Sequence, residues 1–462
     1  MITTLWHWTF GSILCSLILV YIIRPVSECV LVTLASSFDA VRSYPKSAKT
    51  PAEIDSCGCS NQRIADTSDL HLGTHKPSNP LPVLKLFLTA KMTPRALNFG
   101  AGPSALPEAV LREAGEALLD FQGTGMGIAE ISHRSKEFKN YIQGVESDIR
   151  KLLKVPESHV ILFTQGGGCA QFSAVVLNML AAHHDQHPAL TSEQRSMDYI
   201  VTGSWSDKAA KEAKRLGGAK VNVIVDSRKF SEQGKFDNIP SHKNDTYKFS
   251  ENPVLIYYCA NETVDGVEFA REEDKETSFP FHLLPKNPPL VGDYSSSFMS
   301  HPIPHLADHA IIYAGAQKNL GPAGLTVLIV RKDCIVDVDK AARNGAIPIP
   351  LCTAYSTLAN HQSLYNTPPV LSIYISGLVL KRMIQEFGED AMEKYAQFSA
   401  NKSKMVYDAL EKGVQRQVFR KKVKEGSGSQ MNVVFDVIGE GKLDEFIAGA
   451  EARNMKGLRG HR

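Results

Sequence analysis

The chain has 462 residues, of which 43% are hydrophobic and 22% charged, and its net charge is +2. This length exceeds that of one compact domain, and the composition is typical of a soluble globular protein. The small net charge gives no reason to expect nucleic acid or an acidic membrane surface as a partner. The eight cysteines show neither zinc-site spacing nor a disulfide framework, so we expect no metal site and free thiols in a reducing compartment.

The N-terminal part differs from the rest of the chain. Residues 5–23 are almost entirely apolar, which is long enough to span a bilayer, so a membrane anchor is one interpretation. Residues 44–80 are polar, rich in Pro, Ser, Asp and Lys, and lack periodicity, which indicates a disordered linker.

A strand, a glycine turn and a helix follow one another in the next part of the chain. Pro107–Leu119 has helical spacing with proline in the first turn, and it predicts a helix. Val160–Thr164 is a short apolar run, three glycines follow it, and Ser173–Leu180 again has helical spacing. Backbone N–H groups at such a helix start, together with the helix dipole, form a site for an anion such as phosphate. A tight turn alone would also explain the glycines.

Two charged residues then stand at probable strand ends. The run Pro289–Gly292 ends at Asp293, and open α/β sheets bind ligands at that edge. Lys318 lies in a glycine-rich turn between the apolar runs Ala310–Tyr313 and Leu325–Val330. Burial at such a turn lowers the pKa of a lysine and frees its amine for bonding to an aldehyde. A solvated turn lysine and a capping aspartate are the ordinary alternatives.

A phosphate cradle, a strand-end aspartate and a turn lysine, in this order, are what pyridoxal phosphate requires of a protein. The alternation of apolar strands and helices from about 158 to 332 predicts an α/β protein with a mostly parallel sheet covered on both faces. Ser372–Met383 predicts the start of a long helix, Met431–Val437 a strand and Lys442–Arg453 a helix of a smaller C-terminal domain.

Several longer motifs resemble the phosphoserine aminotransferases, a group of the class V aminotransferases with the type I pyridoxal-phosphate fold. The resemblance covers the chain from about Leu97 to its last residue. Its motifs, in order, are Asn98–Pro107, Glu130–Ser135, Gln165–Gln171, Gly203–Ser206, Asn261–Phe269, Gly315–Asn319, Tyr365–Pro369 and Gly460–Arg462. Their common order makes chance an implausible explanation.

The resemblance implies a role for each matching residue. Lys318 would bond to the cofactor aldehyde and act as the catalytic acid and base, and Asp293 would pair with the ring nitrogen. Trp205 would stack on the ring, and Thr263 would bind the ring hydroxyl. The cofactor phosphate would be held by Gly168, Cys169 and Gln317, and by Asn366 and Thr367 of the second subunit of a homodimer.

Substrate binding is implied for His133, Arg134, His461 and Arg462, since arginine binds phosphate and carboxylate bidentately. Some relatives carry an arginine where Cys169 stands. The expected reaction converts 3-phosphohydroxypyruvate and glutamate to O-phosphoserine and 2-oxoglutarate in serine biosynthesis. Another class V enzyme, such as an alanine–glyoxylate or serine–pyruvate transaminase, and an inactive truncated product are the alternatives.

The expected organisation has three parts. Residues 1–91 form an extension outside the family, 92–350 the large cofactor-binding domain, and 351–462 a small domain. The family continues beyond the Gly460–Arg462 motif, so we expect the small domain to be incomplete. We interpret the extension as sequence outside the working enzyme and expect a cytoplasmic protein, with a membrane anchor through residues 5–23 as the alternative.

Overall fold

The computed structural model describes residues 94–243 and 245–460. The expected apolar segment 5–23, the linker at 44–80, and the substrate residues His461 and Arg462 therefore lie outside the described residues. Within the part that is described, no helix has both the length and the apolar character to cross a membrane.

A seven-stranded sheet forms the centre of the large domain. In spatial order its strands are β2 (His159–Thr164), β10 (Thr326–Arg331), β9 (His309–Gly315), β8 (Leu290–Asp293), β5 (Leu255–Cys259), β3 (Ser196–Val201) and β4 (Lys220–Asp226). Only β10 runs antiparallel to its neighbours β2 and β9, and the other pairings in this sheet are parallel. The expected mostly parallel sheet is thus confirmed, and the strands other than β10 end at the same edge.

Both faces of this sheet are buried, because alternate residues of each strand enter different cores. Tyr257 and Tyr313 belong to one core together with α6 and α7, whereas Tyr258 and Ile312 belong to the other with α5 and α10. Strands buried on both sides have no polar face, which explains the continuous apolar runs in the sequence.

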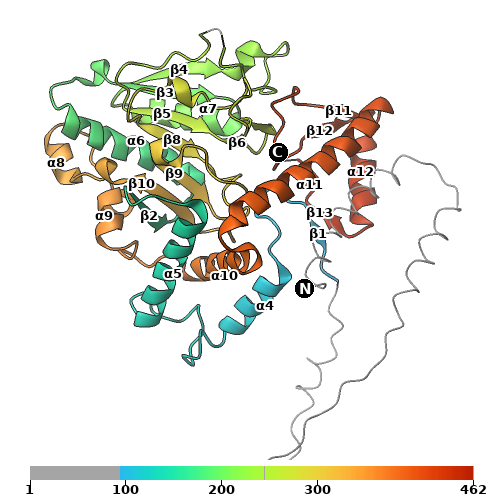
Figure 1. Cartoon of the computed structure of the whole chain (residues 1–462), viewed down its shortest axis with the longest axis horizontal. Helices are drawn as coiled ribbons and strands as arrows, with labels where there is room; N and C mark the ends of the chain where they lie inside the picture. Colours follow the sequence, from blue (N-terminus) through green and yellow to red (C-terminus); the bar gives the residue numbers. More distant parts are fainter. Residues whose placement is uncertain (1–93, 244, 461–462) are drawn as a thin grey trace, which may run out of the picture. The chain divides into compact units, whose positions relative to one another are not determined.

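The helices lie in two layers around the sheet (Figure 1). One layer consists of α6 (Gly167–Gln186) and α7 (Ser204–Leu216). The opposite layer contains α4 (Glu108–Ala117), α5 (Lys136–Leu153) and α10 (Val370–Phe387), and further helices are α8 (Val338–Arg343) and α9 (Tyr355–Asn360). The helices expected from Pro107 and Ser372 are confirmed, with Pro107 at the N-cap of α4.

The C-terminal part packs around the long helix α11 (Ala391–Gln415). It contains α12 (Lys442–Glu451) and the antiparallel strands β11 (Phe419–Lys421) and β12 (Phe435–Val437). The short strand β1 (Leu97–Asn98) pairs with β13 (Met455–Lys456), so the start of the described chain joins this part. The strand expected from Met431 begins only at Phe435, because Ser429 Oγ accepts the backbone N–H groups of residues 431 and 432 and forms a turn there.

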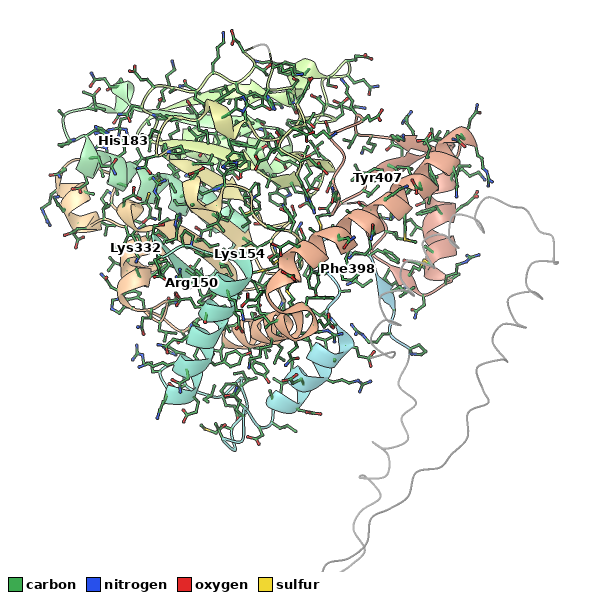
Figure 2. The ribbon with its side chains drawn as sticks, in the orientation of Figure 1. Arg150, Lys154, His183, Lys332, Phe398 and Tyr407 are labelled. Carbon is green, nitrogen blue, oxygen red and sulfur yellow. The ribbon has the colours of Figure 1, made fainter. Side chains whose placement is uncertain are left out.

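Long polar side chains fasten these elements together, and two of them are visible in Figure 2. Arg150 on α5 donates to the carbonyls of Pro156 at 3.2 Å and His159 at 3.3 Å, which ties the helix end to the start of β2. Tyr407 on α11 donates to the carbonyl of Ser429 at 3.0 Å, so α11 is joined to the segment before β12.

The close contact of α5 with α10 yields a stability test. A Cβ on Gly377 of α10 would lie 2.3 Å from Tyr141 Oη, which donates to the carbonyl of Tyr374 at 2.7 Å. We expect Gly377→Ala to lower the free energy of unfolding by about 1–3 kcal/mol through overpacking, measured by denaturant unfolding. Gly144→Ala on α5 is the control, because nothing lies within 4 Å of its added Cβ. A helix-interior alanine there should add about 0.5–1 kcal/mol, and equal effects of the two substitutions would contradict the packing argument.

Candidate functional site

The carboxyl ends of the parallel strands bring the predicted residues to one edge of the sheet. Asp293 is the last residue of β8, Lys318 follows β9, and Thr263 follows β5 and β6 (Asn261–Glu262). Gly168 follows β2, and Trp205 follows β3. Residues far apart in the sequence meet here because parallel strands share this edge.

Lys318 makes a direct contact with another predicted residue. Its Nζ donates to Thr263 Oγ1 at 2.6 Å, and a Cβ on Gly102 would lie 3.1 Å from its Cε, so the chain before α4 covers the lysine closely. Burial lowers the pKa of Lys318 from 10.5 to about 8, although Asp293, Cys259 and Glu262 oppose this shift. The neutral amine is therefore accessible near physiological pH.

Asp293 is a buried carboxylate with hydrogen bonds from neutral donors. It is 5% exposed, and it accepts from the backbone N–H of Ser295 at 2.9 Å and from Tyr313 Oη at 3.0 Å. Tyr313 Oη also lies 2.8 Å from Tyr257 Oη, so an O–H chain leads from the core to this carboxylate. Burial raises the pKa of Asp293, and the hydrogen bonds and Lys318 counteract this rise. Asp293 can pair with a cationic ligand atom, since no ion pair joins it to a cation among residues 94–243 and 245–460.

The glycine turn after β2 places the start of α6 beside Asp293. Gly166 and Gly167 have φ values of 92° and 61°, and a Cβ on Gly168 would lie 3.7 Å from Asp293 Oδ2. Cys169 is exposed and lies in the first turn of α6. The first N–H groups of a helix have no partner within it, so this turn can bind an anion.

Trp205 and Gln317 lie in the same region. Trp205 is the second residue of α7, its ring centroid is 6.4 Å from that of Phe172, and Lys208 Nζ lies 4.3 Å from it. Gln317 precedes Lys318, and its carbonyl accepts from the backbone N–H of Ser104 at 2.9 Å.

Asn366 and Thr367 are exposed at the end of the segment between α9 and α10. The carbonyl of Thr367 accepts from Gln165 Nε2 at 3.0 Å, next to the glycine turn, but within the described chain no hydrogen bond joins either residue to Lys318 or Asp293.

The predicted substrate pair lies at the start of α5, apart from these contacts. Arg134 is exposed, and Ser135 caps the helix by accepting from the backbone N–H of Phe138 at 3.1 Å. His133 Nε2 is buried without a hydrogen-bond partner in the described structure, and burial and Arg134 lower the pKa of this histidine. No hydrogen bond or ion pair links His133 or Arg134 to Lys318 within the described part of one chain.

Sequence reasoning missed Glu262, which is fully buried at this edge. Its carboxylate accepts from the backbone N–H groups of Trp205 and Ser206, both at 2.9 Å, and burial raises its pKa to about 7. A glutamate three residues beyond the end of the apolar strand Leu255–Cys259 was the available signal, since a buried carboxylate requires specific partners.

A sequence model of the class-V aminotransferases matches residues 96–457. The chain belongs to this family. The phosphoserine aminotransferase of Paraburkholderia phytofirmans is 38% identical over 368 residues, which are 80% of this chain and 91% of that protein.

Two solved structures are also similar to this class-V aminotransferase. The phosphoserine aminotransferase from Bacillus circulans subsp. alkalophilus is 34% identical with a TM-score of 0.67, covering 80% of this chain and 91% of that one. That from Trichomonas vaginalis, solved with pyridoxal phosphate bound, is 31% identical with a TM-score of 0.65, covering 79% and 92%. The resemblance inferred from the motifs is thus confirmed, and pyridoxal 5′-phosphate is the cofactor of the family.

The reactivity of Lys318 tests its environment. We expect its modification by trinitrobenzenesulfonate in the cofactor-free protein to rise with pH and to be half-maximal near pH 8, because burial lowers its pKa to about 8. Peptide mapping by mass spectrometry at a series of pH values measures the rate. Solvated lysines, which titrate at about 10.4, serve as internal controls. A half-maximal rate for Lys318 above pH 10 would show that its ammonium is not desolvated.

Proposed function

We propose that this class-V aminotransferase is a phosphoserine transaminase. It transfers an amino group between glutamate and 3-phosphohydroxypyruvate and forms O-phosphoserine and 2-oxoglutarate, a step of serine biosynthesis. The observation that carries the proposal is the placement of Lys318, with its lowered pKa, on the same strand edge as buried Asp293, which lacks a cationic partner in the described chain. The similarity to phosphoserine aminotransferases over most of the chain supports this choice of substrate.

The residues at the site fit pyridoxal 5′-phosphate. Buried Asp293 suits a protonated ring nitrogen, and the first turn of α6, with the N–H groups of Gly168 and Cys169, suits the phosphate. Gln317 adds a polar side chain for the phosphate, Thr263 a hydroxyl for the ring hydroxyl, and Trp205 a flat surface for the ring. When bound, the cofactor supplies an electron sink for the negative charge that develops at the substrate Cα.

Lys318 has two tasks in this proposal. Its neutral amine would hold the cofactor aldehyde, and as a free amine it would take the proton from the substrate Cα and later return one. A pKa of about 8 allows the amine to accept and donate this proton near neutral pH. Thr263, whose hydroxyl accepts from Nζ at 2.6 Å, orients the lysine. Asp293 would hold the ring nitrogen of the cofactor in its protonated state and so stabilise the negative charge that develops at the substrate Cα.

We further propose a homodimer whose active sites are shared. Asn366 and Thr367 are exposed and form no hydrogen bond with Lys318 within the described part of their own chain, which is consistent with a role in the site of a second subunit. The cationic Arg134, together with His133, His461 and Arg462, would bind the substrate phosphate and carboxylate. Exposed Arg134 is free to make such contacts, since no ion pair includes it in the described structure.

We also propose that residues 1–91 lie outside the catalytic unit and that the enzyme works in the cytoplasm. The family match starts at residue 96, after this extension. The proposed cofactor-binding residues, from Gly168 to Thr367, all lie within the matched region.

Replacing the lysine tests the chemistry. We expect Lys318→Ala to abolish transamination and the visible absorbance of bound cofactor, because the amine that bonds the aldehyde is removed. Lys332→Ala is the control, since Lys332 is an exposed lysine directly after β10 (Figure 2). Spectra and initial rates of the two variants give the comparison, and near-normal turnover by Lys318→Ala would refute the assignment.

Replacing the arginine tests the substrate. We expect Arg134→Ala to lower kcat/KM for phosphoserine by about 30-fold or more, the equivalent of a lost charge-assisted hydrogen-bond pair of about 2–4 kcal/mol. Cofactor affinity and kcat/KM for unphosphorylated serine should change little. Equal losses for serine and phosphoserine would assign Arg134 a structural role instead, and serine preferred over phosphoserine by the parent enzyme would favour an alanine–glyoxylate or serine–pyruvate type of transaminase.

A further inference from the structure

Two carboxylates of one hairpin bind the first turn of α7. The hairpin consists of β6 and β7 (Val267–Glu268) and the turn between them. Glu262 accepts from the backbone N–H groups of Trp205 and Ser206. Asp265 accepts from the backbone N–H of Ser204 at 2.6 Å and from its hydroxyl at 3.2 Å. Three successive N–H groups of the helix start are therefore bound by side chains from a different part of the chain.

The first turn of α7 depends on these carboxylates because its own N-cap residue has no side chain. Gly203 occupies the N-cap, where Ser, Thr, Asp or Asn usually accepts the first N–H groups. A Cβ on Gly203 would lie 2.3–2.7 Å from three side-chain carbons of Glu262, so glycine is required for the glutamate to approach. Ser206 Oγ cannot replace the glutamate, since it accepts from the backbone N–H groups of Thr202 and Gly203.

Thr263 lies between the two carboxylates in the sequence and contacts the lysine. Its Oγ1 accepts from Lys318 Nζ at 2.6 Å, while its neighbour Glu262 binds the N–H of Trp205. The hairpin thus connects Trp205, on a helix after β3, with Lys318, in the turn after β9. A fully buried carboxylate with two N–H donors has little freedom to move, so it fixes the separation of these side chains.

We propose that Glu262 is a positioning residue. By binding the backbone at the start of α7, Glu262 fixes the positions of Trp205 and Thr263 relative to Lys318. Asp265 has the same role with a smaller effect. This inference rests on the proposed function, because the relative placement of Trp205, Thr263 and Lys318 matters only if all three contact the same cofactor. Glu262 itself does not react, and its effect on the reaction passes through the residues that it places.

The electrostatics of Glu262 agree with this role. Burial raises its pKa to about 7, whereas its hydrogen bonds to Ser206 and Trp205 lower it and Asp265 raises it. The two backbone N–H groups thus recover part of the cost of desolvation. Glutamine is the informative replacement, because it keeps the shape but turns one acceptor oxygen into an NH₂ donor that faces a backbone N–H.

The experiment uses the fluorescence of Trp205 to report how accessible this side chain is. The chain has three tryptophans, so the full-length variant Trp6→Phe/Trp8→Phe retains Trp205 alone. In this background we compare Glu262→Gln, Asp265→Asn and the control Asp207→Asn. Asp207 lies in the same first turn of α7, but its carboxylate binds the side chains of Lys211 and Arg228 and not the hairpin. Acrylamide quenching of Trp205 is measured without cofactor, and the Kd for pyridoxal 5′-phosphate, kcat and the Tm are measured for each variant.

We expect Glu262→Gln to increase the quenching of Trp205 and to raise the cofactor Kd by about tenfold or more, since charge-assisted hydrogen bonds change equilibrium constants by that order. Asp265→Asn should produce smaller changes of the same kind, and Asp207→Asn should resemble the parent. If Glu262→Gln fails to fold, the comparison of Asp265→Asn with Asp207→Asn decides the question.

A lower Tm with unchanged Trp205 quenching and unchanged cofactor Kd would show an ordinary structural cap and would overturn the proposal. Identical behaviour of Asp265→Asn and Asp207→Asn, with Glu262→Gln unfolded, would overturn it as well. The proposed function can fail separately: a parent protein without transaminase activity would refute it, while the quenching measurements would still show whether Glu262 restrains Trp205.

Discussion

The site depends on the burial of a carboxylate and an amine at one sheet edge without a direct ion pair between them. Attraction between Asp293 and Lys318 raises the pKa of the lysine and lowers that of the aspartate, but desolvation outweighs it for both groups. Neither group is held in an ion pair with the other, so both Lys318 and Asp293 remain available to a ligand. A direct salt bridge would instead neutralise both groups and leave neither available for the cofactor.

The fold holds this arrangement through neutral hydrogen bonds. Tyr313 and the backbone of Ser295 bind the two oxygens of Asp293, and Tyr257 supports Tyr313 from the core. Thr263 is the corresponding neutral partner of Lys318, and its hydroxyl accepts from Lys318 Nζ. Neutral hydrogen-bond partners orient a charged group but add no opposite charge, so the group can still pair with a ligand of opposite charge. The cofactor proposed for this edge would offer both partners, a cationic nitrogen for Asp293 and an aldehyde for Lys318.

Much of this could be predicted from the sequence because it rests on local patterns. The apolar runs around Lys318 and before Asp293 identify buried strands, and glycines after Thr164 mark a helix start, so the strand-edge location of these residues follows from short stretches of chain. The parallel sheet follows in turn from the alternation of strands and helices. The strand predicted from Met431 was too long, because a single Ser429 hydroxyl forms a turn that periodicity does not reveal.

What the sequence could not reveal are contacts between distant segments. Nothing local to Glu262 indicates that it binds the start of a helix some sixty residues earlier in the chain, with sequence separations of 57 and 56 for its two bonds. The glycine at position 203 is equally uninformative until Glu262 is seen in the space that a Cβ would fill. Motifs such as Gly203–Ser206 and Asn261–Phe269 therefore contain two kinds of residue, those proposed to bind the cofactor and those that pack the two motifs against each other. Trp205 and Thr263 are the residues proposed to contact the cofactor, whereas Gly203 and Glu262 make the two segments fit each other, so a change in one motif has to be compatible with the other.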